Sequence, residues 1–188
     1  SAASDVYKRQ NSSHTRMAYM FWQLMHAEEP YLTDDLSEEM KVARTTTIGD
    51  LNRLRKAIEK YDLKIKGKAN TGLALCGDEF NIRLFILENI YEQLYLNFPL
   101  GQTIREKLYD FQERLSMDAL GFGFFYRFFV VMIQRMESGH TIKKLKPKYE
   151  ELYESSAYMI VDEFLNEIEQ VKGYKISKEE RLFLSISV

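Results

Sequence analysis

The spacing of the apolar residues changes at Leu63, and this change constrains the fold more than any other feature. Before it, Leu51, Leu54 and Ile58 recur at the spacing of an amphipathic helix. After it, alternate residues are apolar on both sides of the segment GKANTG, namely Leu63, Ile65, Leu73 and Leu75. Alternation on both sides of a glycine-bounded turn predicts a β-hairpin. The chain therefore passes from a helix to a hairpin within one small domain.

Two more helices are predicted upstream of this point. The first runs from about Thr15 to His26, and Pro30 ends that region because proline cannot donate a hydrogen bond inside a helix. Thr33 is the expected N-cap of a short second helix that carries Leu36 and Met40.

The stretch SEEMKVARTTTIGDLNRLRK, residues 37–56, is either one helix or two helices joined by a turn. A single helix would carry a run of weak helix formers, VARTTTIG, in its middle. Its early apolar positions would also be out of phase with Leu51 and Leu54. A break near Val42 and Ala43 removes both difficulties. Three helices followed by a hairpin is the order of a winged helix-turn-helix, so we predict a mainly α chain that begins with such a domain.

Charge is concentrated in the same region. Between Lys41 and Lys68 there are nine basic and three acidic residues, a local charge of +6, although the whole chain carries −2. Six acidic residues lie just upstream: Glu28, Glu29, Asp34, Asp35, Glu38 and Glu39. The net charge excludes a general nucleic-acid binder, whereas a local basic block is typical of a small DNA-binding module. A solvated helix face is the alternative interpretation.

The run LTDDLSEEMKVARTTTIGDLNRLRKAIEKYDLKIKGKANTGLALCG resembles the helix-turn-helix and wing of BglG/Mga-like bacterial sugar-operon regulators. Ten residues occupy matching places: Leu36, Val42, Arg44, Thr46, Asp50, Leu51, Leu54, Gly72, Leu75 and Gly77. Two positions depart from the pattern. Ala43 replaces a capping serine, and Gly49 lies in mid-helix, each at a cost of about 1 kcal/mol.

The second half of the chain predicts a helical bundle. It contains a long helix from Asp78 or Glu79, a second around Ile104 to Leu115, and a third, apolar on nearly all sides, from Met117 to Glu137. A fourth helix is expected to span Tyr149 to Ile168, and Ser177 with Glu180 forms a capping box for the last.

The segments MIQRMESGHTI, LKPKYEELYESSAYMI and ISKEERLFLSI in this half resemble the phosphotransferase-system regulation domain of the same regulators. We therefore expect a non-native or disordered leader at 1–12, a winged helix-turn-helix domain at 13–77 and a regulation-domain-like helical domain at 78–188. Full-length relatives continue into further domains, so the chain is expected to be an N-terminal fragment.

Candidate DNA contacts follow from the predicted recognition helix. Residues early in such a helix face base edges, and those expected here are Arg44, Thr45, Thr46, Ile48, Asn52 and Arg53. Phosphate contacts are expected from Lys41, Lys56, Lys66 and Lys68. Leu51, Leu54 and Ile58 belong to the core in either interpretation. The acids of the preceding helix would repel phosphate, so binding is expected to be weak or to need a homodimer.

The sequence offers little chemistry for an enzyme. Its histidines, His14, His26 and His140, are scattered, and its single cysteine, Cys76, permits no internal disulfide. We expect no cofactor, no metal, no membrane association and a cytoplasmic location. The longest apolar run, Leu120 to Ile133, is judged too short to cross a bilayer.

The resemblance also implies two phosphorylated histidines, and this chain has neither. The first would stand at the position of Phe128 and the second at that of Ser187. We predict that Phe128 is buried and that the domain accepts no phosphoryl group. The domain would then relay signals from phosphotransferase proteins through domains absent from this chain, or it would serve mainly for dimerisation, since we expect the helical half to form a homodimer.

We interpret the chain as a DNA-binding transcriptional regulator of a carbohydrate operon, with double-stranded DNA as its partner. A degenerate dimerisation or sensory module without DNA contact is the first alternative. An RNA-binding antiterminator is the second. The sequence does not reveal the operon, the sugar or the signal that would replace histidine phosphorylation.

Overall fold

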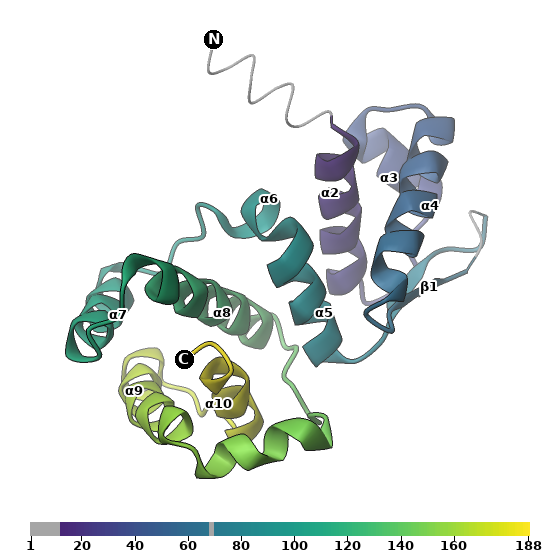
Figure 1. Cartoon of the computed structure of the whole chain (residues 1–188). Coiled ribbons are helices and arrows are strands. Elements are labelled where there is room, and N and C mark those ends of the chain that lie inside the picture. Colours follow the sequence, from purple (N-terminus) through teal and green to yellow (C-terminus); the bar gives the residue numbers. More distant parts are fainter. Residues whose placement is uncertain (1–11, 68–69) are drawn as a thin grey trace. The chain divides into compact units, whose positions relative to one another are not determined.

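The computed structural model describes residues 12–67 and 70–188 (Figure 1). The chain divides into two compact units, the first ending at Leu96 and the second running from Asn97 to Val188. Each unit is described by itself. Helices dominate both of them, which confirms the predicted mainly α fold.

The first unit begins with helices α2 (Ser13–His26), α3 (Thr33–Met40) and α4 (Arg44–Glu59). Helix α2 has the expected position, and Ser12 caps it by accepting a hydrogen bond from the Thr15 backbone N–H at 3.1 Å. The prediction that Thr33 caps α3 is wrong. Leu32 holds the N-cap position without a side-chain bond, and Thr33 is buried as the first helical residue.

The turn between α3 and α4 confirms the predicted break. Lys41 ends α3 in the left-handed conformation, with φ of 55°. Ala43 is the N-cap of α4 and makes no side-chain cap bond, as expected from the missing serine. The buried hydroxyls of Ser37 and Thr47 lie 2.8 Å apart and join the two helices beside the turn.

A two-stranded antiparallel hairpin follows α4, as predicted. Strands β1 (Lys64–Lys66) and β2 (Ala74–Cys76) pair with Ile65 opposite Leu75. The turn requires a glycine at Gly67. Its φ is +106°, and a Cβ there would lie 2.0 Å from the Gly72 carbonyl oxygen. The hairpin also bonds to the α2–α3 connection, where Tyr31 exchanges backbone hydrogen bonds with Leu73.

The helical stretch after the hairpin belongs to the first unit. It consists of α5 (Glu79–Phe85), a π-helical turn η1 (Ile86–Ile90) and α6 (Tyr91–Tyr95). Phe85 packs against Phe21 of α2 and Tyr61, with ring centroids 4.7 and 5.3 Å apart. This packing explains why the compact unit ends at Leu96, whereas the sequence placed a boundary after Gly77.

The second unit contains α7 (Gln102–Arg114), α8 (Ala119–Glu137), the 3₁₀ helix η2 (Pro147–Glu154), α9 (Ser156–Lys172) and α10 (Lys178–Ser185). The prediction of one helix from Tyr149 to Ile168 is wrong. Ser155 separates η2 from α9 because its hydroxyl accepts from the Tyr158 N–H at 3.1 Å and caps a new helix.

The predicted cap of α10 forms at Ser177. The Glu180 N–H donates to the Ser177 hydroxyl at 3.3 Å. The Glu180 carboxylate is buried and accepts from the Ile142 N–H at 2.7 Å, which fixes the segment that follows α8.

Helix α8 is apolar on all sides but is not buried along its whole length. Its second half, from Phe125 onward, lies in the core, whereas Leu120 is 85% exposed and Phe124 is 54% exposed. Among the described residues, α8 is the helix that is long and apolar enough to be a candidate for crossing a membrane. The run Leu120 to Ile133, which the sequence suggested was too short, is only part of this helix. Its buried half is the pattern of a central core helix.

Candidate nucleic-acid interface

Helix α4 has one buried face and one exposed face. The buried residues are Thr47, Asp50, Leu51, Leu54 and Ile58. The helical period places Thr45, Gly49, Asn52 and Lys56 on the opposite side. We call these four residues the exposed row; Thr45, Asn52 and Lys56 are exposed, and Gly49 between them is half-buried. Leu51, Leu54 and Ile58 are each at most 3% exposed, which confirms them as core.

Most of the predicted DNA contacts lie on the surface of the first unit. The exposed ones are Lys41, Arg44, Thr45, Asn52, Arg53, Lys56 and Lys66, while Thr46 and Ile48 are half-buried. Lys68 lies outside the described residues. The structure thus gathers these side chains on α4, its preceding turn and the hairpin, and their contact with DNA stays a prediction.

Arg44 connects the first turn of α4 to two other elements. Its Nη1 lies 3.1 Å from Asp34 Oδ1 on α3, and its Nη2 donates to Asn70 Oδ1 of the hairpin turn at 2.7 Å. Both partners of the ion pair are solvent-exposed, at 44% and 68%. Exposed pairs of this kind contribute little to stability, so a phosphate or a guanine can replace Asp34 at small cost.

Asp50 is the polar centre of the buried face, and sequence reasoning missed this role. Its carboxylate is fully buried and accepts from Arg16 Nε at 2.5 Å, from the Ser13 hydroxyl at 2.8 Å and from Arg53. Burial alone would raise the pKa of Asp50, but these hydrogen bonds outweigh it and hold that pKa below its ordinary value. The carboxylate fixes α2 against α4. An acid on the apolar face of a predicted helix was the available signal.

Arg53 is turned toward α2 and is only partly available to a ligand. Its Nε donates to the Ser13 hydroxyl at 2.9 Å while its guanidinium pairs with Asp50. Its side chain is nevertheless 56% exposed. The base contact expected of Arg53 from the sequence stays a prediction.

Arg55, which the sequence did not single out, ties the hairpin to α4. Its Nη2 donates to the Gly67 carbonyl oxygen at 3.1 Å. Together with the Arg44–Asn70 bond, this contact holds the hairpin turn beside the first and fourth turns of the helix. The hairpin and α4 therefore present one continuous surface.

One of the acids upstream of α4, Glu39, belongs to an exposed polar cluster. Glu39 accepts from the Tyr19 hydroxyl at 2.9 Å, from Gln23 Nε2 at 3.2 Å and from the Tyr31 hydroxyl. Burial, the largest effect, opposes ionisation of Glu39, but the three hydrogen bonds lower its pKa overall. Burial and the bond to Glu39 raise the pKa of Tyr31 to about 12. The cluster links α2, α3 and the residue that bonds to the hairpin.

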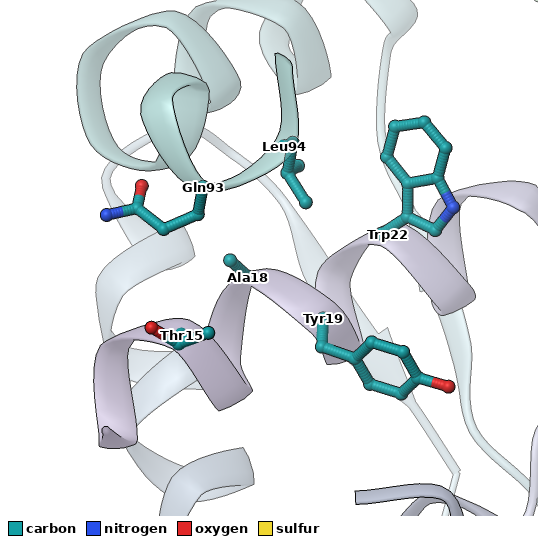
Figure 2. Close-up of a pocket in the computed structure, with 6 residues that line it drawn as sticks. All are labelled: Thr15, Ala18, Tyr19, Trp22, Gln93 and Leu94. Carbon is teal, nitrogen blue, oxygen red and sulfur yellow. The ribbon is translucent and has the colours of Figure 1, made fainter. Parts of the chain in front are cut away.

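The first unit also has a hollow of about 310 Å³ away from the exposed row. Figure 2 shows that α2 supplies one wall through Thr15, Ala18, Tyr19 and Trp22, while Gln93 and Leu94 of α6 supply the other. The lining is mainly apolar and contains no carboxylate or histidine. Across the described residues, no three His, Cys, Asp or Glu side chains gather closely enough to hold a metal ion.

The two positions where regulation domains carry histidine are both buried in the second unit. Phe128 is 4% exposed, and its ring packs against that of Phe183, with centroids 5.0 Å apart. Ser187 is 7% exposed and donates to the Leu184 carbonyl oxygen at 2.6 Å. The predicted burial of Phe128 is confirmed.

Comparison with known proteins finds similarity to transcription regulators. Residues 7–89 match the model of the Mga helix-turn-helix domain. The chain is also similar to the probable licABCH operon regulator of Bacillus subtilis (strain 168), with 31% identity over 78 residues, which is 42% of this chain and 12% of that protein. The chain thus spans only a small part of the relative's length. The predicted resemblance to Mga/BglG-like regulators is confirmed for the first unit, and the match indicates a DNA-binding domain that acts in transcription regulation.

Proposed function

We propose that the chain is a DNA-binding transcriptional regulator of a carbohydrate-utilisation operon linked to the phosphotransferase system. The observation that carries this proposal is the position of α4. The Mga helix-turn-helix match covers it completely, and its exposed row is polar while its opposite face is fixed by Asp50. The name of the Bacillus relative, an operon regulator, supports the kind of target.

In this proposal α4 enters the major groove. Thr45 and Asn52 of the exposed row meet base edges, where an asparagine amide is suited to adenine and a threonine methyl to thymine. Arg44 turns from Asp34 to a guanine. Lys41, Lys56 and Lys66 bind phosphates, as we also expect of Lys68, and the hairpin acts as the wing that follows the backbone.

The acids of α3 limit the affinity of this interface, and its phosphate contacts make the affinity sensitive to salt. Asp34, Asp35 and Glu38 are exposed close to the first turn of α4, although Asp34 is paired with Arg44. Each phosphate contact releases counterions, so affinity falls steeply as salt rises. Dimerisation would compensate by joining two such interfaces on successive major grooves of a palindrome.

The second unit supplies this dimerisation and acts as a regulation domain that accepts no phosphoryl group. Its exposed apolar side chains on α8, Leu120 and Phe124, are the surface we assign to the partner subunit. Leu120→Asp should then convert a dimer to a monomer by light scattering at tens of micromolar, with unchanged helical content. A wild-type monomer at that concentration would contradict the assignment. The location that fits this function is the cytoplasm.

The proposal is tested by selecting duplexes from a random DNA library and measuring fluorescence anisotropy at low salt. Arg44→Ala should lower affinity by about 1–3 kcal/mol and relax the base preference at one position. Lys66→Ala should weaken all sequences equally. Lys175→Ala, on a side chain of the second unit that is 94% exposed, is the matched control and should change nothing. Absence of wild-type binding at high protein concentration would overturn the proposal.

A further inference from the structure

Gly49 lies in the middle of the exposed row of α4, and the fold does not require it there. Glycine is the poorest helix former after proline, so its presence as the sixth residue of α4 weakens this helix. Thr45 lies one turn before it on the same face, and Asn52 and Arg53 lie one turn after it. A residue that destabilises a helix at this point needs another physical reason.

The space around Gly49 is open on the protein's side. A Cβ built there would meet only the Nη1 and Nη2 atoms of Arg53, both at 3.8 Å, which is an ordinary contact. Its φ is not positive, so alanine would adopt the same backbone without strain. The glycines of the hairpin differ, since a Cβ on Gly72 would lie 2.6 Å from Pro30 and one on Gly77 would lie 2.4 Å from Leu63. Those glycines are explained by the fold, and Gly49 is not.

We propose that Gly49 is a specificity-determining residue that lets the backbone of α4 touch the floor of the major groove, where it receives a thymine methyl group. This inference rests on the proposed function, because it needs α4 to enter DNA. The missing side chain leaves room for a methyl group between Thr45 and Asn52. This space is bounded by the apolar Cα of the glycine and by the Arg53 guanidinium, whose Nη1 and Nη2 lie 3.8 Å from where a Cβ would stand. The thymine methyl is the apolar group that projects into the major groove from a base pair. An added Cβ would occupy the same space.

The test combines a protein substitution with a DNA substitution. The full chain is prepared as wild type, Gly49→Ala and Gly123→Ala, and each is titrated against the duplex selected with the wild type. Gly123 lies in α8, and a Cβ there would meet no atom within 4 Å, so alanine improves helix propensity equally without touching the exposed row. Because Gly123 is a neighbour of Leu120 and Phe124, light scattering must show the wild-type mass for Gly123→Ala before its DNA affinity is compared. In parallel, each thymine of the duplex is replaced in turn by deoxyuridine, which removes only the methyl group.

Both alanine variants should raise the melting temperature by a few degrees, which shows that they are folded. Gly49→Ala should weaken binding about tenfold, the usual size of a lost base contact, and Gly123→Ala should leave it unchanged. One deoxyuridine substitution should weaken the wild type severalfold yet have no such effect on Gly49→Ala. Wild-type affinity and an unchanged thymine profile in Gly49→Ala would overturn the inference while leaving the proposed function intact. A wild type that binds no duplex would overturn both.

Discussion

Each unit buries a charged side chain at the centre of a hydrogen-bond network, but the two networks have opposite polarity. In the first unit Asp50 accepts from Arg16, Ser13 and Arg53. In the second unit Arg181 of α10 is only 8% exposed at its side chain and donates to three side chains of α9: Asp162 at 2.9 Å, Asn166 at 2.8 Å and Glu169 at 2.7 Å. The Ile176 carbonyl oxygen also accepts from its Nε at 3.1 Å.

The two networks differ in how their outer members meet solvent. In the Arg181 network the cation is buried and the exposed member is an acid, Asp162, at 43%, so this network joins α9 to α10 and presents no cation to a phosphate. The Asp50 network instead ends in Arg53, whose side chain is 56% exposed beside the exposed row. A ligand that attracts Arg53 therefore also acts on the contact that orients α4. The comparison teaches that a buried charge can be purely structural in one unit and coupled to a binding surface in the other.

The largest expected effect is on the internal network. Arg181→Ala should lower the free energy of unfolding by about 3–5 kcal/mol, because it leaves Glu169 and the Ile176 carbonyl without their buried donor. Urea unfolding followed by circular dichroism measures this. Lys175→Ala is the control, since Lys175 lies 3.9 Å from the same Glu169 but is 94% exposed, and it should change stability by less than about 0.5 kcal/mol. If both variants lost the same free energy of unfolding, Arg181 would not be the residue that holds α9 and α10 together.

A smaller effect is expected at the network beside the binding face. Asp50→Asn should cost about 2–3 kcal/mol, less than Arg181→Ala, because Arg53 can turn to solvent once the carboxylate charge is lost. DNA affinity should change as well, since the angle of α4 depends on this contact. Asp35→Asn, on the exposed face of α3, controls for the change in net charge. If Asp50→Asn bound DNA with wild-type affinity, the Asp50 network would have no influence on the DNA interface.

The sequence predicted the order of elements and the break before α4, because apolar period and weak helix formers are local signals. The networks were not predicted, since Arg16 and Asp50 meet only through the packing of α2 on α4. The break at Ser155 was missed because apolar residues continue in phase across it. Likewise, the bond from Arg53 to the distant Ser13 was not predicted. The one signal in the sequence for these networks was the position of Asp50, an acidic residue on the apolar face of a predicted helix.

Acid should weaken both networks. The pKa of Asp50 is lowered because its hydrogen bonds outweigh its burial, and the pKa of Glu169 is lowered first by the Ile176 N–H. Lowered pKa values give stability that is complete above the unfolded values and is lost as pH falls through the folded ones, so unfolding free energy should be level above about pH 5 and decline below it. Asp50→Asn should flatten part of this decline in a urea series across pH 2–6. A wild-type curve that rises toward low pH would contradict the account.

The smallest expected effect concerns the exposed cluster around Glu39. Tyr31→Phe should cost about 0.5–1.5 kcal/mol, the net contribution of one hydrogen bond. Because the pKa of Tyr31 is raised to about 12, its contribution is complete below pH 10 and is lost as pH rises through 12. The difference between the ultraviolet titrations of the wild type and Tyr31→Phe should show one tyrosine with a pKa of about 12, and Glu39→Gln should return that pKa toward 10. Tyr109→Phe, on an exposed side chain of the second unit, is the control.

The central claim, that the exposed row of α4 binds duplex DNA, is tested most directly by amide chemical shifts. The ¹⁵N-labelled full chain is titrated at low salt with the selected duplex. The account predicts that amides of residues 44–56, Gly49 among them, shift together with those of the hairpin, while amides around Arg181 stay in place. Shifts confined to residues 97–188, or no shifts at all, would contradict it.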